Sequence, residues 1–195
     1  MRKLLISLVG NTGVGKSTLG ELLHLTLSDF ALLRIDDYRK KFNKAGTKEG
    51  ETLAQKAFLK DVEKNHRVIL ESSGIGMNYQ SYIHSFIKSA NANEKNVLTI
   101  KLVCVEQERQ WRLTNRNLAG YNYPPMPKEY EKLFSQETAL NSRFKFIDVD
   151  ADIVIDTNRF TTKQQFQLSM AAIEIFGIKS EWRTSNERGR PKKAA

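Results

Sequence analysis

The chain of 195 residues has room for one well-packed domain, and its 40% hydrophobic content is ordinary for a soluble globular protein. Cys104 is its one cysteine, which excludes an intrachain disulfide and a cysteine-rich zinc site. No apolar run approaches the ~20 residues of a membrane-spanning helix, so we expect a cytoplasmic protein. The formal net charge of +9 favours a polyanionic partner.

Five apolar segments rich in β-forming residues recur along the chain, and each is followed by a stretch typical of a helix or a loop. They lie at 3–9, 30–35, 67–70, 97–105 and 152–155. This alternation predicts an α/β fold with a five-stranded parallel sheet flanked by helices, in a domain over residues 1–178. Ligands of such folds bind at the carboxyl ends of the strands, where we look for functional residues.

A glycine-rich loop follows the first segment and fits the pattern G-x-x-x-x-G-K-[ST] at every constrained position. The loop and the residue after it are Gly10, Asn11, Thr12, Gly13, Val14, Gly15, Lys16, Ser17 and Thr18. The glycines let successive backbone N–H groups point at a polyphosphate. Lys16 supplies a charge for the terminal phosphates and Ser17 a hydroxyl for Mg²⁺. Because a strand precedes the loop and a helical pattern follows it, the sequence predicts a P-loop kinase fold that binds ATP and Mg²⁺.

Two aspartates follow the second segment. Asp37 is expected to cap a helix that begins near Tyr38, since Asp is favoured at that position. Asp36 then stays at the strand tip, where its carboxylate can accept the proton of an attacking hydroxyl. The polar stretch 40–50 that follows is expected to be a mobile loop.

The third segment ends in Glu71, which is either a ligand in the outer shell of Mg²⁺ or a plain loop carboxylate. Ser72 and Gly74 follow it as candidate substrate-binding residues, because a glycine there allows a substrate to approach closely. After the fifth segment, Thr157 is a candidate for binding the nucleotide.

Arg109, Arg112 and Arg116 are spaced so that a helix would place all three on one face. Like charges so placed repel one another unless an anion or a carboxylate relieves them. One interpretation is a solvated face relieved by Glu108. We favour a helical lid over about 106–127, in which Arg112 and Arg116 neutralise charge on the transferred phosphoryl group.

Taken together, these blocks resemble the kinase domain of phage polynucleotide kinase and its P-loop relatives over roughly residues 3–160. The resemblance rests on the phosphate loop, on Arg34-Ile35-Asp36-Asp37-Tyr38-Arg39, on Val68-Ile69-Leu70-Glu71-Ser72-Ser73 and on Asn115-Arg116-Asn117. It implies that Asp36 is the general base, that Arg39 contacts a phosphate of the nucleic-acid acceptor, and that Arg116 contacts the ATP phosphates.

The chain departs from the family at two places. Ser72 and Gly74 stand where the family has an Asp and an Asn, and the stretch 118–121 replaces a second lid arginine. The acceptor pocket is therefore altered. Related phage kinases phosphorylate the hydroxymethyl group of a modified pyrimidine, such as 5-hydroxymethyluracil, so the resemblance implies a DNA kinase acting on such a group or on a 5′-hydroxyl end.

Residues 179–195 hold six Lys or Arg against two Glu. Within them, Arg188-Gly189-Arg190-Pro191-Lys192-Lys193 resembles the core of an AT-hook, a segment that lies in the narrow minor groove of A·T-rich duplex DNA. We expect a disordered tail that binds DNA through Arg188, Arg190 and Lys192. Two alternatives stay open, namely a small-molecule or nucleotide kinase of the same fold and a nucleotide-gated DNA-binding module.

Overall fold

A computed structural model of the chain describes residues 3–42, 46–73, 76–89, 96–118 and 149–188. Strands and helices alternate along these residues as the sequence predicts. The strands are β1 (Leu4–Val9), β2 (Ala31–Arg34), β3 (Arg67–Glu71), β4 (Val97–Val103) and β5 (Ile153–Asp156). The helices are α1 (Lys16–Thr26), α2 (Ile35–Phe42), α3 (Lys48–Lys64), α4 (Gly76–Ser89), α5 (Glu106–Leu118) and α8 (Thr162–Arg188).

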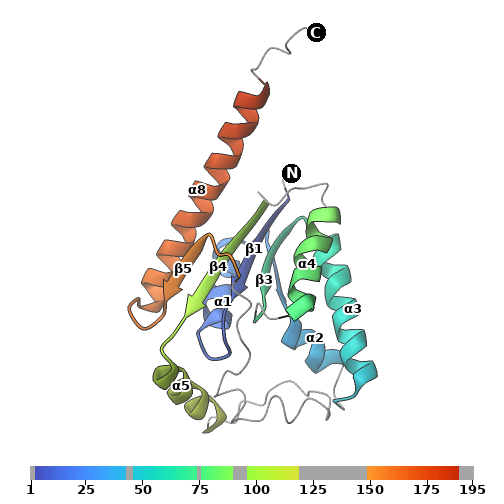
Figure 1. Cartoon of the computed structure of the whole chain (residues 1–195), viewed down its shortest axis with the longest axis vertical. Helices are drawn as coiled ribbons and strands as arrows, with labels where there is room; N and C mark the ends of the chain where they lie inside the picture. The colour runs from blue at the N-terminus through green and yellow to red at the C-terminus, as the bar shows by residue number, and fades with distance from the viewer. Residues whose placement is uncertain (1–2, 43–45, 74–75, 90–95, 119–148, 189–195) are drawn as a thin grey trace.

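The five strands form one parallel sheet in the order β2-β3-β1-β4-β5, which confirms the predicted α/β fold (Figure 1). β1 lies at the centre, with Ile6 paired to Ile69 of β3 on one side and to Leu98 of β4 on the other. Both faces of β1 are covered by side chains, so this strand is apolar almost throughout, as expected for a parallel sheet with helices on both faces.

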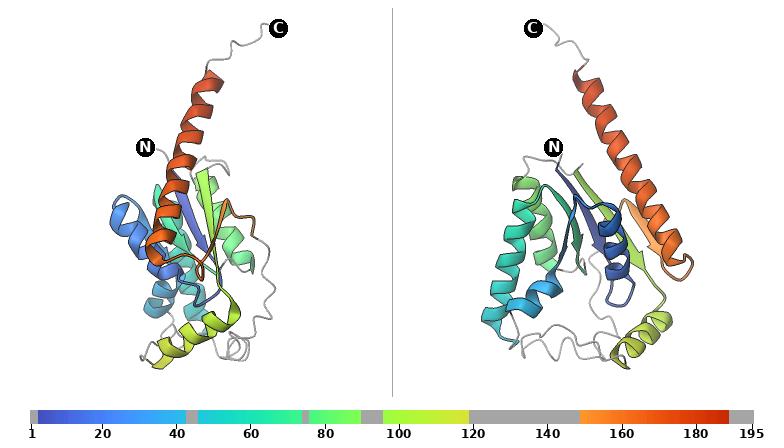
Figure 2. Two further views of the ribbon diagram at one scale, coloured as in Figure 1. Left: turned by 90° about the vertical axis from the view of Figure 1, so that its left-hand side faces the viewer. Right: turned by 180° about the vertical axis from the view of Figure 1, so that it is seen from behind.

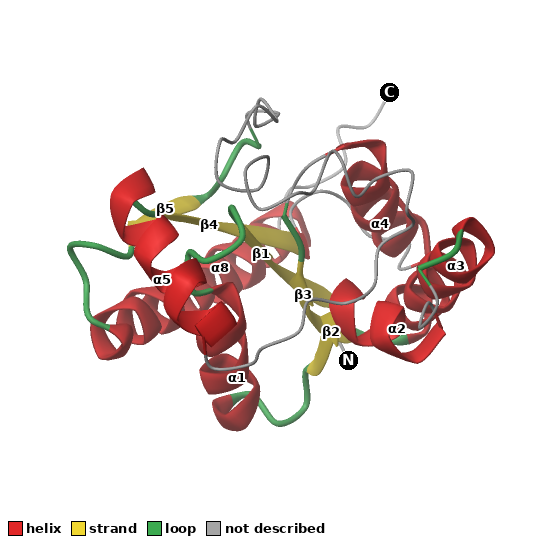
Figure 3. Ribbon diagram, turned by 90° about the horizontal axis from the view of Figure 1, so that it is seen from below, coloured by secondary structure: helices red, strands yellow, loops and turns green. Residues whose placement is uncertain are grey.

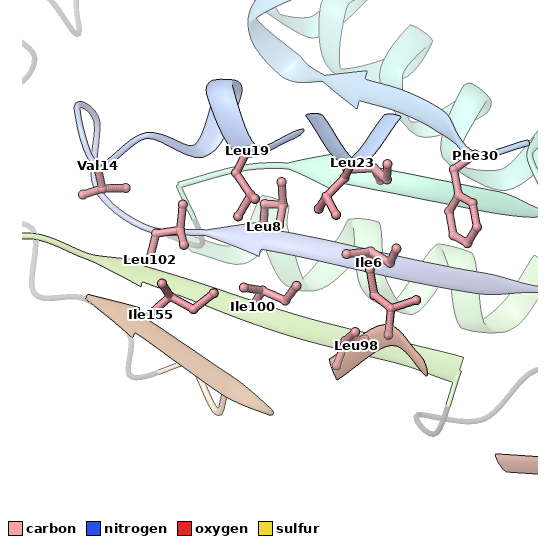
Figure 4. Close-up of a cluster of buried hydrophobic side chains, with 12 residues drawn as sticks. Ile6, Leu8, Val14, Leu19, Leu23, Phe30, Leu98, Ile100, Leu102 and Ile155 are labelled. Atoms are coloured by element: carbon pink, nitrogen blue, oxygen red, sulfur yellow. The ribbon is translucent and has the colours of Figure 1, made fainter. Parts of the chain in front are cut away.

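α1 and α8 cover one face of the sheet. Ile6 and Leu8 of β1 point to this face and pack with Leu19 and Leu23 of α1 and with Ile173 of α8 (Figure 4). All five side chains are buried, so this contact removes a large apolar area from water and fixes α1 against the strand that precedes the phosphate loop.

α3 and α4 cover the opposite face (Figure 2). Leu5 and Val9 of β1 alternate with Ile6 and Leu8, so they point to this opposite face, where they pack with Phe58 of α3 and Phe86 of α4. Phe58 also meets the ring of Tyr82 edge to face, with ring centroids 4.7 Å apart. The two cores hold the sheet rigidly enough to position residues at its carboxyl edge.

Two predicted boundaries differ from the structure. The stretch 40–50, expected to be a loop, contains the end of α2 and the start of α3, whose N-cap is the Thr47 side chain. α8 runs to Arg188, so residues 179–188 are helical rather than disordered, since no proline or glycine interrupts the chain there. The division into a domain and a DNA-binding tail stays a prediction.

The carboxyl ends of the strands meet at one edge of the sheet, where α5 lies on one side and α2 and α3 lie on the other (Figure 3). This arrangement places the phosphate loop between two sets of charged helices. Within the described part of the chain, no helix is long and apolar enough to cross a membrane.

Candidate active site

The phosphate loop ends at Gly15, which is the N-cap of α1 and has left-handed backbone angles of φ 101° and ψ 12°. No side chain caps this helix, and its first turn holds no acidic residue. The first N–H groups of α1 therefore lack the side-chain acceptor that a helix start usually has. With the partial positive charge of the helix start, they suit a phosphate group, as predicted.

Two glycines of the loop cannot be replaced without a clash. A Cβ on Gly10 (φ 148°) would lie 2.4 Å from the carbonyl oxygen of Leu102 in β4. A Cβ on Gly13 (φ 89°) would meet the side chains of Arg109 and Leu113 of α5 at 3.1 to 3.2 Å. The loop is thus pressed between the sheet and α5, and its side chain at Val14 is buried in the core rather than turned outward.

Lys16 Nζ donates to the carbonyl oxygens of Gly10 and Asn11 at 2.8 and 2.9 Å. Its ammonium group therefore lies over the loop, as the phosphate-binding role requires. Ser17 Oγ donates to Oε1 of Glu71 at 2.7 Å, which joins the start of α1 to the end of β3. Thr18 follows in the first turn of α1 and is exposed.

Glu71 has the properties expected of a residue near a cation. Its second oxygen, Oε2, is buried and has no hydrogen-bond partner. Burial and the charge of Asp36 raise the pKa of its carboxyl above the usual range, although Lys16, Ser17 and Arg34 act in the opposite direction. An unpaired buried carboxylate oxygen beside a hydroxyl fits Mg²⁺, which is commonly held by one or two protein groups together with substrate phosphates. The described residues contain no cluster of three or more His, Cys, Asp or Glu side chains that could hold a metal ion by themselves.

The predicted helix cap at Asp37 is wrong. α2 begins at Ile35, directly after β2, so both Asp36 and Asp37 lie in its first turn. Acidic side chains there interact favourably with the partial positive charge of the helix start. Asp37 instead accepts a hydrogen bond from Nε of Arg34 at 2.7 Å. The charge of Asp36 is one of the causes that raise the pKa of Glu71, the carboxyl that Ser17 contacts.

Arg39 is paired with carboxylates. It donates from Nε and Nη2 to Glu51 of α3 at 2.9 to 3.1 Å and from Nη1 to Asp36 at 3.1 Å. Burial alone would lower the pKa of Arg39, but Glu51 and Asp36 raise it above its ordinary value, so the guanidinium stays charged. In this structure Arg39 is held by the protein itself rather than turned toward an acceptor phosphate.

Arg109 and Arg112 of α5 have different surroundings and do not act as one solvated face. Arg109 is 1% exposed and lies against the phosphate loop, where it donates to the carbonyl oxygen of Thr12 at 3.3 Å and to both carboxylate oxygens of Glu106. A helical wheel cannot show this, because it does not say what the helix packs against. Arg109 therefore joins α5 to the loop.

Arg112 bridges α5 and the end of β5. It donates from Nη1 to Oγ1 of Thr157 at 3.0 Å, from Nη2 to the carbonyl oxygen of Thr157 at 3.2 Å, and from Nε to Glu108 at 2.9 Å. Glu108 thus offsets the positive charge of Arg112, as one of the two interpretations of the sequence predicts. The backbone of Arg116 lies in α5, but its side chain is outside what the structure describes.

Of the remaining candidate residues, the structure describes the surroundings of Ser72 only. Ser72 is buried, and its N–H donates to the carbonyl oxygen of Leu8 in β1 at 3.1 Å. Gly74, Arg190 and Lys192 lie outside the described residues, and Arg188 is described only as the last residue of α8.

Sequence reasoning missed Glu51, Tyr82 and Glu106. Glu51 lies twelve residues after Arg39 on the next helix, so no local spacing connects the two. Tyr82 lies on α4, is 6% exposed, and has its pKa raised to about 12, mainly by burial, with Arg39 and Glu51 close enough to act on it. Glu106 was predictable in part, because a Glu three residues before an Arg on a helix is a common ion pair.

Comparisons with protein-family models and with curated proteins find no match. Solved structures do match over almost their whole length. A kinase candidate from Chloroflexus aurantiacus has a TM-score of 0.65 at 15% identity, with 88% of this chain and 99% of that chain covered. A gluconokinase from Sinorhizobium meliloti has a TM-score of 0.59 at 17% identity, covering 94% and 99%. The Mycobacterium tuberculosis APS kinase CysC, in complex with AMPPNP and APS, has a TM-score of 0.59 at 13% identity, covering 89% and 98%. At such identities the likeness shows the fold alone, which is that of P-loop kinases.

Proposed function

We propose that the protein is an ATP-dependent kinase that transfers the γ-phosphoryl group of Mg²⁺·ATP to a hydroxyl group of a small molecule. The observation that carries this proposal is the hydrogen bond from Ser17 to Glu71. The other carboxylate oxygen of Glu71 is buried and has no hydrogen-bond partner, and the charge of Asp36 acts on the pKa of this carboxyl. These contacts support a phosphate site at the start of α1, a cation site at Glu71 and a base at Asp36. Kinases of small molecules among the structures of the same fold support the proposal.

The residues divide the work as follows. The N–H groups at the start of α1 and the ammonium of Lys16 bind the phosphates. Ser17 and Glu71 would hold Mg²⁺, which would supply neutralisation of the charge on the phosphate oxygens. The Asp36 carboxylate accepts the proton of the acceptor hydroxyl as its oxygen bonds to the γ-phosphorus and the bond to ADP breaks. Arg112, fixed by Thr157, places a cation beside the nucleotide side of the site.

A small acceptor is favoured over DNA by the state of Arg39. In the polynucleotide kinase resemblance this arginine contacts an acceptor phosphate, but here it is already bound by Glu51 and Asp36. Of these two carboxylates Glu51 is buried, so a DNA phosphate that displaced it would leave it unpaired, which is costly.

The direct test supplies γ-labelled ATP with, in separate reactions, sugars and polyols, nucleosides, nucleotides, an oligonucleotide with a free 5′-hydroxyl, and duplex DNA containing hydroxymethylpyrimidine. The proposal expects label in a small molecule and loss of that label in Asp36→Asn. Label found in DNA alone would contradict the small acceptor and return the function to a DNA kinase.

DNA stays the second candidate because of one sequence feature, the Arg-Gly-Arg-Pro order that begins at Arg188. Deleting residues 188–195 removes four basic side chains, so binding to A·T-rich duplex should weaken and its salt dependence should become shallower. A variant with the same residues in scrambled order keeps the charge and serves as the control. Equal affinity of the truncated and full chains across a salt titration would rule out DNA binding through this segment.

A further inference from the structure

A charged network extends from the phosphate loop to the helices on the other side of the carboxyl edge. Asp36 accepts a hydrogen bond from Arg39 at 3.1 Å, and its charge also raises the pKa of Glu71. Arg39 in turn binds Glu51 of α3 through two nitrogens, and the amide of Gln55 donates to the same carboxylate at 2.9 Å. An acceptor whose hydroxyl reaches Asp36 therefore lies beside this network.

The network is negative beside Asp36. One guanidinium faces two carboxylates, so Asp36, Arg39 and Glu51 together carry a formal charge of −1. Exposure shows which groups an acceptor can meet: the Asp36 side chain is 55% exposed, that of Arg39 is 21% exposed, and that of Glu51 only 11%. The most accessible member is thus a carboxylate, and the cation behind it has its donors directed at protein oxygens.

Aromatic rings fix this arrangement. Tyr38 meets Phe58 edge to face at 5.2 Å, and Phe58 meets Tyr82 at 4.7 Å. Tyr38 also donates from its hydroxyl to Asp61 at 2.6 Å, which ties α2 to α3. Because α2 is held in this way, Arg39 cannot move far from Glu51 without breaking a buried contact between the two helices.

Resting on the proposed kinase function, we propose that the acceptor is a hydroxyl compound without negative charge, either neutral or cationic, and that Glu51 determines this preference by binding Arg39. A carboxylate, phosphate or sulfate on the acceptor would lie beside the Asp36 carboxylate, and each nitrogen of Arg39 already donates to a carboxylate with which the anion would have to compete. A neutral polyol or an amino sugar meets no such repulsion and can donate to the exposed oxygen of Asp36.

The test compares acceptors that differ in charge through one substituent: glucose, glucosamine and glucuronate, and a nucleoside with its 3′-monophosphate, which keeps the 5′-hydroxyl. For each we measure kcat/KM with γ-labelled ATP, and equilibrium binding in the presence of AMPPNP and Mg²⁺. The wild-type protein should favour the neutral or cationic member of a pair by about tenfold or more, the effect of one strong charge-assisted contact. Preference for the anionic member would overturn the proposal.

The variant Glu51→Gln keeps the size of the side chain and removes its charge, so part of Arg39 becomes available to an anion. It should raise the anionic-to-neutral ratio of kcat/KM about tenfold, whereas Glu49→Gln, at an exposed position on the first turn of the same helix, should leave the ratio unchanged. An unchanged ratio in folded Glu51→Gln would overturn the role of Glu51, and the wild-type comparison stands even if this variant does not fold.

The two proposals fail in different ways. Transfer confined to anionic acceptors would overturn the charge preference and leave the kinase function in place. Absence of transfer to every compound, with AMPPNP and Mg²⁺ still bound, would overturn both.

Discussion

Oγ of Ser17 and Oε1 of Glu71 are 2.7 Å apart, and this hydrogen bond joins the helix that follows the phosphate loop to the end of the neighbouring strand β3. Since β1 and β3 are parallel neighbours with Leu8 paired to Glu71, the sheet register itself brings the two side chains together. The partnerless Oε2 of Glu71 marks the same point as a cation site.

Glu71→Gln should therefore raise the Mg²⁺ concentration needed for half-maximal activity, by about tenfold if one carboxylate contact to the ion's shell is lost. The amide oxygen of Gln can still accept from Ser17, so the melting temperature should change little. Activity as a function of Mg²⁺ concentration checks this, with Glu21→Gln, a largely exposed partner of Arg34, as the control. An unchanged Mg²⁺ profile would exclude Glu71 from the cation site.

Asp36→Asn should lower the rate of phosphoryl transfer by about 10²-fold or more, because a general base is lost. Nucleotide binding should be kept, because the start of α1 that binds the phosphates is unchanged. Asp37→Asn removes only a half-exposed ion pair with Arg34, so its effect on unfolding free energy should stay below about 1 kcal/mol. Steady-state rates and urea denaturation distinguish the two. If Asp37→Asn is the inactive variant, the base is assigned to the wrong aspartate.

The sheet and the phosphate loop were predictable because their signals are local. Strands buried on both faces are continuous apolar runs, and two glycines of the loop meet tight surroundings, Gly10 at the backbone of β4 and Gly13 at the side chains of α5. The start of α2 was not predictable, since α2 follows β2 without a loop and an aspartate in a first turn resembles a cap. The contacts of Arg109 and Arg39 were not predictable because their partners, the Thr12 carbonyl and Glu51, depend on tertiary packing.

Arg109→Met should destabilise the protein by about 1–3 kcal/mol, since it removes the hydrogen bond that this buried guanidinium donates to the Thr12 carbonyl, whereas Glu106, whose side chain is 46% exposed, is solvated once it is unpaired. Nucleotide affinity should fall with it, because Arg109 also supports the loop at Gly13. Urea denaturation and AMPPNP titration measure the two effects. Arg159→Met, whose side chain is 81% exposed, is the matched control and should stay within about 0.5 kcal/mol of wild type.

Stability should fall as the pH rises from 10 to about 12, with Tyr82 as one cause. Its pKa is raised from 10.0 to about 12 in the folded protein, so between these values the unfolded chain releases a proton that the folded chain retains. The contribution of Tyr82 to the free energy of unfolding is full below pH 10. As the pH rises above 10, this contribution falls by up to about 1.4 kcal/mol per pH unit. Denaturation across this range should show a shallower loss in Tyr82→Phe, and identical slopes would mean that Tyr82 titrates normally.

Phosphoryl transfer by the Lys16 and Asp36 site is measured most directly by counting both products of a single turnover. With an accepted hydroxyl compound and γ-labelled ATP, the wild-type protein should form one phosphorylated acceptor for each ADP, and Lys16→Met should form neither at a comparable rate while keeping its fold. ADP matched by free phosphate, with no phosphorylated acceptor from any class of hydroxyl compound, would show a nucleotide-hydrolysing module instead and would contradict the kinase account.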